Sequence, residues 1–220
     1  MTSSPAEVTA LVLAGGGSHG SVQVGMLRAL VRSGFSADMI VGTSVGAVNG
    51  AFFASDPTLS GISRLTDLWH GIRRGHIYPS PPSTWLPLLL GRRAHLCDSR
   101  GLCALLDRTF DSLEFDKLKV RCAFVAADFR TGEEVILQTG LVRTAVLASA
   151  AIPVIFPSVL LDGRRLVDGA LSRNTAIHAA LTLGATRVVV LPTGFACGMK
   201  ELPRGGVATA LHHISILFAR

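Results

Sequence analysis

The sequence has little charge, few aromatic side chains and no apolar stretch long enough to cross a membrane. Only 16% of its 220 residues are charged and 6% are aromatic, whereas 49% are hydrophobic. The longest apolar stretch, residues 145–161, contains Pro153 and Pro157 and falls short of the roughly 20 residues that a spanning helix needs. The composition therefore predicts one buried core and a single domain over residues 1–220, whose motif-bearing part covers about residues 8–192.

Signals for metal binding, disulfide formation and secretion are also missing. The cysteines, Cys97, Cys103, Cys122 and Cys197, show neither C-x-x-C spacing nor a histidine at zinc-finger distance, so we expect buried thiols and no metal site. The first ten residues carry an acid and a proline where a signal peptide has basic residues followed by an apolar core. We therefore expect a cytoplasmic location.

The net charge of +6 and the pI near 9.8 suit an anionic partner, either lipid or nucleic acid. The basic residues lie in scattered pairs such as Arg73-Arg74 and Arg164-Arg165, with neither a basic run nor aromatic residues between them. This pattern does not favour a nucleic-acid surface and leaves an anionic interface as the remaining possibility.

Apolar segments of alternating type predict an α/β fold. Residues 8–14 and 39–43 are short apolar runs, typical of strands buried on both faces of a parallel sheet. Residues 22–32 and 45–53 have helical character, so the first third of the chain follows a β-α-β-α order. We expect a single, mostly parallel central sheet flanked by helices.

The rest of the chain predicts further helices and two hairpins. Turn residues at Thr131-Gly132 and at Asp162-Gly163 join short apolar runs, which indicates hairpins, the first of them at an edge of the sheet. The expected helices cover residues 62–72, 102–110, 144–151 and 176–183, and the expected strands cover residues 120–128, 134–138, 160–161, 165–167 and 187–191. The fold of residues 78–90 is left open.

A G-x-S-x-G motif, Gly42 to Gly46, lies between a predicted strand and a predicted helix. This arrangement is typical of a nucleophile elbow, in which glycines allow a turn so sharp that the serine hydroxyl projects freely. Ser44 is therefore a candidate nucleophile. The alternative is a glycine-rich turn with an incidental serine, because short matches to this motif are common.

A second glycine-rich segment, Gly15 to Gly20, directly follows the first predicted strand. One interpretation is a dinucleotide fingerprint, but its ribose-binding acid belongs at the end of the second strand, whereas Asp38 precedes that strand. The other is an oxyanion hole, in which backbone N–H groups of the loop act together with the N–H of Val45. In the second interpretation the loop and the elbow form one site.

A serine nucleophile needs a base, and no histidine stands late in the chain where a Ser-Asp-His order requires one. Asp168 is the remaining candidate, because it ends a predicted hairpin strand and precedes Gly169-Ala170. Taken alone, Asp-Gly is also a common turn dipeptide. The histidines are His19, His70, His76, His95, His178, His212 and His213.

Together these motifs resemble the patatin-like phospholipase family. The resemblance rests on the glycine loop, the elbow, residues 148–157 and Asp168-Gly169-Ala170, and it extends from about residue 11 to residue 171. It implies an α/β fold and a Ser-Asp dyad that cleaves ester bonds of lipids without a metal or an organic cofactor. We therefore expect a serine acyl hydrolase of phospholipids or other lipid esters. The alternative is a non-catalytic module that binds a nucleotide or phosphate on the glycine loop.

The resemblance assigns a role to each matching residue. Ser44 is the nucleophile and Asp168 the base, whose pKa burial must raise above its ordinary value of about 3.9. His19 stands in the loop where the family often has Arg or Lys, so we expect it to contact substrate and to alter the phosphate preference. The oxyanion donors are Gly15, Gly16 and Gly17 with Val45, and the other motif glycines are Gly20, Gly42, Gly46 and Gly169.

Two further segments are candidates for binding a lipid surface or a partner protein. Residues 85–90, which include Trp85 and a leucine run beside Arg92-Arg93, form either a lipid-docking loop or a buried loop. A predicted helix over residues 207–218 belongs either to the core or to a partner-binding surface. We expect a lipid ester as substrate and contact with membranes only at their surface, with no nucleic-acid partner. The sequence leaves the oligomeric state open.

Overall fold

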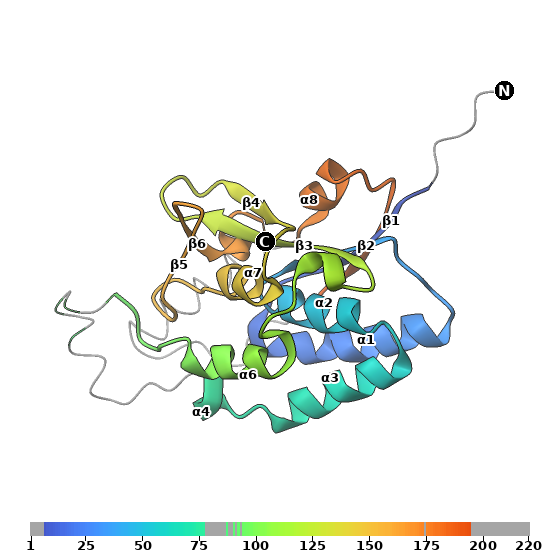
Figure 1. Cartoon of the computed structure of the whole chain (residues 1–220), viewed down its shortest axis with the longest axis horizontal. Coiled ribbons are helices and arrows are strands. Elements are labelled where there is room, and N and C mark those ends of the chain that lie inside the picture. Colours follow the sequence, from blue (N-terminus) through green and yellow to red (C-terminus); the bar gives the residue numbers. More distant parts are fainter. Residues whose placement is uncertain are drawn as a thin grey trace.

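The computed structural model describes residues 7–77, 87, 90, 92, 94–173 and 175–194 (Figure 1). Seven strands form one mixed sheet with helices on both faces, which confirms the α/β fold class. None of the helices within these ranges is both long enough and apolar enough to span a bilayer. The predicted helix over residues 207–218 and nearly all of the segment over residues 78–90 lie outside the described residues.

Four strands form the parallel part of the sheet, in the order β7–β1–β2–β3. Every residue of β1 and β2 is buried, as expected for apolar strands that are covered on both faces. Their bounds agree closely with those predicted from the apolar runs. The strands are β1 (Thr9–Leu13), β2 (Met39–Thr43), β3 (Arg121–Asp128) and β7 (Arg187–Leu191).

Strand β3 is longer than β2 and pairs with antiparallel strands as well. On one side β4 pairs with residues 124–127 of β3. On the other side β2 pairs as far as Val125, and β6 then pairs with residues 126–128 and points back toward the end of β2. Strand β5 forms the second predicted hairpin with β6. The bounds are β4 (Glu134–Leu137), β5 (Val159–Leu161) and β6 (Arg164–Asp168).

Most helices cover one face of the sheet, and α8 covers the other (Figure 1). Helix α2 is buried along nearly its whole length, because it follows β2 directly and contacts α1, α3 and α7 as well as the sheet. The helices are α1 (Gly20–Arg32), α2 (Val45–Ser55), α3 (Leu59–Gly71), α4 (Arg74–Ile77), α6 (Arg100–Phe110), α7 (Val142–Ser149) and α8 (Ile177–Thr182).

Helices α1, α3, α6 and α7 begin two or three residues earlier than the sequence predicted. Helix α3 begins at Leu59, because the side chain of Thr58 caps it by accepting a hydrogen bond from the N–H of Gly61 at 3.2 Å. Helix α1 begins at Gly20, directly after a single 3₁₀ turn, Gly17–His19. The glycine loop and α1 are therefore continuous.

The thiols only partly match the prediction. Cys97 and Cys122 are buried as expected, and burial raises the pKa of the Cys122 thiol, so this residue stays protonated. The prediction of a buried thiol was wrong for Cys103, whose side chain is partly exposed on α6. Cys197 lies outside the described residues.

Candidate active site

Ser44 occupies a strained turn between β2 and α2. Its φ of 55° and ψ of −121° are rare for a residue with a side chain, and they aim the hydroxyl away from both flanking elements. Gly46 lets this turn approach β1, because a Cβ at that position would lie 2.1 Å from the carbonyl oxygen of Leu13. Ser44 is buried, with 5% of its surface exposed. The predicted elbow geometry is present.

The sheet brings Asp168 to Ser44 across 124 residues of sequence. Thr43, the last residue of β2, pairs with Val125, and Asp168, the last residue of β6, pairs with Ala126. Since Val125 and Ala126 are consecutive in β3, the ends of β2 and β6 meet on the same side of that strand. The Ser44 hydroxyl donates a hydrogen bond to Oδ2 of Asp168 at 2.6 Å.

Burial makes Asp168 a stronger base than an ordinary aspartate. Its side chain is almost completely enclosed, and its Oδ1 accepts a hydrogen bond from the N–H of Ala170 at 2.9 Å. Desolvation raises its pKa from 3.8 to about 6, while the hydrogen bonds from Ser44 and Ala170 act in the opposite direction. At neutral pH the carboxylate is therefore ionised and yet basic enough to accept a proton.

Ser44 and Asp168 form no hydrogen bond with a histidine among the residues whose side chains the structure describes. His178 bonds through its ring to Glu134 at 2.9 Å, and the ring of His95 bonds to the carbonyl of Cys97 at 2.8 Å. His19 is exposed at the start of α1, and its expected contact with substrate stays a prediction. The described residues also contain no group of three or more His, Cys, Asp or Glu side chains that could hold a metal ion.

Ser149 supports the elbow, a role that sequence reasoning missed. The backbone N–H of Ser44 donates to the Ser149 hydroxyl at 2.9 Å, and this hydroxyl donates to the carbonyl of Val125 at 2.6 Å. Ser149 ends α7 and is completely buried. It therefore ties the candidate nucleophile to the same part of β3 that positions Asp168. Its place in the segment over residues 148–157 was the only sequence signal.

Three successive carbonyls of the glycine loop are held by hydrogen bonds. The carbonyl of Ala14 accepts from Gln23 Nε2 at 2.9 Å, that of Gly15 from Thr193 Oγ1 at 2.6 Å, and that of Gly16 from a backbone N–H at 3.2 Å. A planar trans peptide directs the next N–H opposite to its carbonyl. The N–H groups of Gly15, Gly16 and Gly17 therefore have fixed directions, and none donates a hydrogen bond to another described residue.

A buried amide network anchors the two ends of the loop. Gln23 also donates to the carbonyl of Leu191 at 2.9 Å, which joins the start of the loop to β7. Asn49 of α2 donates to the carbonyl of Gly20 at 2.9 Å and to Gln23 Oε1 at 2.8 Å, and it accepts from the indole N–H of Trp69. Both amide side chains are fully buried. No sequence signal pointed to this network.

The loop lies directly beside the elbow. A Cβ on Gly20 would lie 2.4 Å from the side chain of Val45, and a Cβ on Gly46 would lie 2.8 Å from the carbonyl oxygen of Ala14. Gly42 stands at the start of the elbow, and Gly169 follows Asp168 against β3. The structure therefore brings together the glycine loop, Val45, Ser44 and Asp168.

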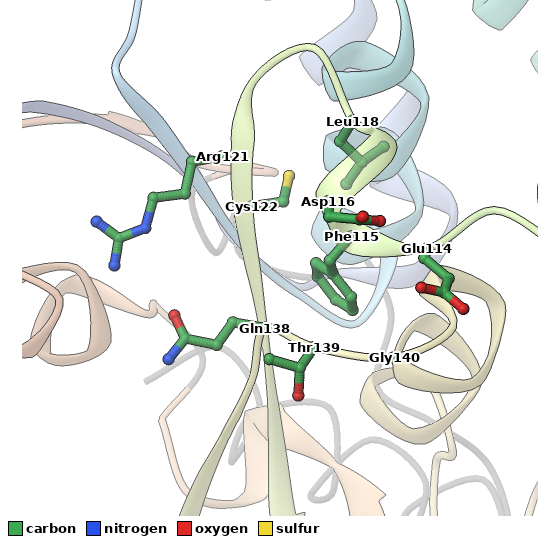
Figure 2. Close-up of a pocket in the computed structure, with 9 residues that line it drawn as sticks. All are labelled: Glu114, Phe115, Asp116, Leu118, Arg121, Cys122, Gln138, Thr139 and Gly140. Carbon is green, nitrogen blue, oxygen red and sulfur yellow. The ribbon is translucent and has the colours of Figure 1, made fainter.

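A separate cavity of about 550 Å³ lies at the opposite end of the sheet (Figure 2). It surrounds the start of β3, whereas Ser44 lies beside the other end of the parallel strands. Arg121 and Gln138 extend to one side of the strand pair, and Phe115 and Leu118 lie on the other, so the polar groups do not converge on one point. Neither Ser44 nor Asp168 lines this cavity.

The model of the family described as patatin-like phospholipase matches residues 11–181. The chain belongs to the patatin-like phospholipase family. This patatin-like domain is 27% identical over 189 residues to a putative patatin-like phospholipase domain-containing protein of Caenorhabditis elegans, M110.7, covering 84% of this chain and 16% of that protein. It is also 27% identical over 184 residues to lysophospholipase nte1 of Aspergillus terreus, with 84% of this chain and 12% of that protein covered.

The solved structure of VipD from Legionella pneumophila has the same fold as this patatin-like domain. Its TM-score is 0.58 at 15% identity, and the match covers 86% of this chain and 50% of VipD. The chain thus spans about half of VipD and less than a fifth of the two curated relatives.

Proposed function

We propose that this patatin-like domain is a serine acyl hydrolase that cleaves ester bonds of phospholipids or other lipids. The observation that carries the proposal is the 2.6 Å hydrogen bond from the Ser44 hydroxyl to the buried carboxylate of Asp168. Membership of the family supports a lipid as substrate. The similarity to a protein named lysophospholipase supports an ester bond as the point of attack.

The reaction would be two successive acyl transfers through a Ser-Asp dyad. Asp168 takes the proton of the Ser44 hydroxyl while Oγ attacks the ester carbonyl carbon. The tetrahedral intermediate then releases the alcohol, whose oxygen takes the proton from Asp168, and leaves an acyl group on Ser44. Water attacks this acyl group, Asp168 takes the proton of the water, and the fatty acid leaves as the Ser44 oxygen regains a proton.

The glycine loop would stabilise the negative charge of both tetrahedral intermediates. The N–H groups of Gly15, Gly16 and Gly17 have fixed directions beside the elbow, and Val45 presents the free N–H of the first residue of α2. The N-terminal end of α2, which carries the positive end of the helix dipole, adds to the stabilisation of negative charge at this position. Donors fixed before the reaction lower its barrier by about 3 kcal/mol each, since they need no reorganisation.

The nucleotide-binding alternative loses its main support. In a dinucleotide fold the ribose-binding acid lies at the carboxyl end of the second strand. Asp38 precedes β2 and accepts a hydrogen bond from the N–H of Thr9 at 2.8 Å, at the opposite end of the sheet from the glycine loop. This carboxylate therefore holds the start of β1 and does not face the loop.

Labelling with a fluorophosphonate probe tests the proposal. The unmodified protein should react at Ser44, and Ser44→Ala should abolish labelling and lower hydrolysis of lipid esters by at least about a thousandfold. Ser36→Ala, at an exposed serine, is the matched control and should label normally. Absence of labelling in a folded, unmodified protein would reject the hydrolase and favour the binding module. A panel of phospholipids and neutral esters would then define the substrate.

A further inference from the structure

The two most exposed large hydrophobic side chains among the described residues lie on either side of one residue, Arg165. They are Leu160 of β5, with 67% of its surface exposed, and Phe129, which directly follows β3 and is 59% exposed. Asp128 pairs with Leu166 and the N–H of Phe129 donates to the carbonyl of Arg165 at 2.8 Å, so Phe129 lies opposite Arg165. Leu160 pairs with Arg165 from the other side.

These pairings place Phe129, Arg165 and Leu160 in one row across three strands. Residues opposite each other in antiparallel strands share a face of the sheet. The adjacent row has Leu166 and Val159 on the other face, where Leu166 is fully buried against Ala148 of α7. An antiparallel hairpin buried on one face normally has polar side chains on the other. Here that outer face carries a phenylalanine and a leucine, which is typical of an interaction surface.

Two arginines accompany the two apolar side chains. Arg130 follows Phe129 in the β3–β4 turn, and Arg165 lies opposite Phe129 in β6; both are exposed. In the described part of the chain neither forms an ion pair, and Arg165 donates only to the Ser158 hydroxyl at 3.2 Å. Glu133 and Asp162 are the acids in the same turns. We call Phe129, Arg130, Leu160 and Arg165 the hairpin patch.

The hairpin patch lies at the same end of the sheet as the candidate active site. The β3–β4 and β5–β6 turns are beside each other beyond the end of β2 (Figure 1). Strand β6 leads from Arg165 to Asp168 in three residues, which is roughly 10 Å at the ordinary rise of a strand. A surface bound at the patch would therefore meet the end of the sheet that holds the Ser44–Asp168 pair.

We propose that the hairpin patch docks this protein on an anionic lipid surface. Phe129 and Leu160 enter the boundary between headgroups and acyl chains, while the arginines bind anionic headgroups. Docking at this end presents lipid esters to Ser44, a consequence that rests on the proposed hydrolase function. The exposed arginines complement anionic headgroups in charge, and the two apolar side chains suit the boundary with the acyl chains, so the patch favours a lipid surface as its partner.

Sedimentation with lipid vesicles tests the docking without any hydrolysis, in the full chain carrying Ser44→Ala. Vesicles of phosphatidylcholine with about one third phosphatidylserine should bind more protein than pure phosphatidylcholine. Phe129→Ser with Leu160→Ser should lower the partition coefficient about tenfold on both vesicles, since apolar area no longer leaves water. Arg130→Gln with Arg165→Gln should lower it about fivefold per arginine, on the anionic vesicles only.

Matched variants at the other end of the sheet provide the controls. Leu59 and Leu141 are exposed to 48% and 41%, and Arg32 and Arg121 are exposed there too. Leu59→Ser with Leu141→Ser, or Arg32→Gln with Arg121→Gln, should leave the partition coefficient within about twofold of the parent. These side chains lie away from the patch, and surface substitutions barely affect folding. Far-UV circular dichroism should be identical for all variants.

Three results would overturn the proposal. They are absence of vesicle binding by folded Ser44→Ala protein, equal partition of the patch and control variants, and a patch variant whose main effect is to turn a dimer into a monomer in analytical ultracentrifugation. Loss of binding by the patch variants supports docking even if the unmodified protein hydrolyses nothing, so failure of the proposed function is separately visible. If the protein is a hydrolase, the patch variants should keep hydrolysis of a soluble short-chain ester and lose that of vesicles.

Discussion

Ser44 and Asp168 each lower the stability of the folded state, Ser44 through its strained backbone and Asp168 through the burial of its carboxylate. Ser44 has a positive φ, which costs on the order of 1–3 kcal/mol for a residue with a side chain. Asp168 is buried as a carboxylate with a pKa raised to about 6. Sites that combine strain with a buried charge are typical of function, because the fold must compensate for them elsewhere.

The raised pKa of Asp168 predicts the pH dependence of hydrolysis. Only the ionised carboxylate accepts the Ser44 proton, so kcat/KM should rise with pH through an apparent pKa of about 6 and then level off. At one pH unit below that value, the rate should be about a tenth of the plateau. Initial rates on a soluble ester between about pH 4.5 and 8.5 would measure the profile. A limb centred near pH 4 would contradict the assignment.

Asp168→Asn gives an independent measure of the same pKa. The folded state holds the proton more tightly than the unfolded state, so the unmodified protein loses stability as pH rises from about 4 to about 6. The shift from 3.8 to about 6 corresponds to about 3 kcal/mol. The variant should therefore be inactive, yet gain up to this much free energy of unfolding relative to the unmodified protein above pH 7. Urea unfolding at several pH values would show whether the difference vanishes near pH 4.

Ser149 gives a prediction about orientation of the nucleophile. Ser149→Ala removes the acceptor of the Ser44 N–H and the donor to Val125, so we expect kcat to fall by about tenfold or more with little change in KM. Thr43→Val is the matched control, because it deletes a neighbouring buried hydroxyl that has no hydrogen-bond partner among the described residues. Equal losses of activity in the two variants would mean that Ser149 only fills space.

The glycine loop and the elbow function as a pair of turns that follow neighbouring parallel strands. Each strand was predictable from an apolar run, and each turn from its glycines. The directions of the N–H groups in the loop were not predictable. They depend on Gln23, which follows the loop, and on Thr193, which lies 178 residues from Gly15 in the chain.

Thr193→Val tests whether the loop is held in advance of the reaction. Valine keeps the shape of threonine but loses the hydroxyl that fixes the Gly15 carbonyl, so the N–H of Gly16 gains freedom. We expect kcat on a soluble ester to fall about tenfold, less than the loss of a whole oxyanion donor, while KM stays nearly constant. Thr193→Ser should restore the rate. Unchanged kcat in the valine variant would show that the loop needs no such support.

The β3–β4 and β5–β6 hairpins show how much local sequence patterns can predict about a sheet. Turn dipeptides at Thr131-Gly132 and Asp162-Gly163 correctly predicted both hairpins, since such turns depend on a few neighbouring residues. They did not predict which strand pairs with which part of β3. Strand β2 pairs with one edge of β3 as far as Val125, and β6 pairs with the same edge from Ala126 onward. This arrangement is a property of strand length and register across the whole sheet, and it is what brings Asp168 to Ser44.

The molecule as a whole holds its candidate site through one continuous sheet. The candidate nucleophile directly follows β2 and the candidate base ends β6, and among the described strands only β3 pairs with both. Partial unfolding that frees β6 would therefore separate the dyad. We expect activity on a soluble ester and far-UV circular dichroism to be lost in one superimposed urea transition. Loss of activity at a clearly lower urea concentration would mean that the β5–β6 hairpin opens independently.

Local sequence patterns were sufficient to predict the fold class, the family and the candidate nucleophile, base and glycine loop. Apolar runs, glycines in tight turns and a serine between a strand and a helix are local features, and their physical causes act over a few residues. Tertiary structure alone decided the 2.6 Å contact between Ser44 and Asp168, the pKa of that carboxylate and the support from Ser149. These depend on register and burial, which arise only when segments more than a hundred residues apart pack on the same strand.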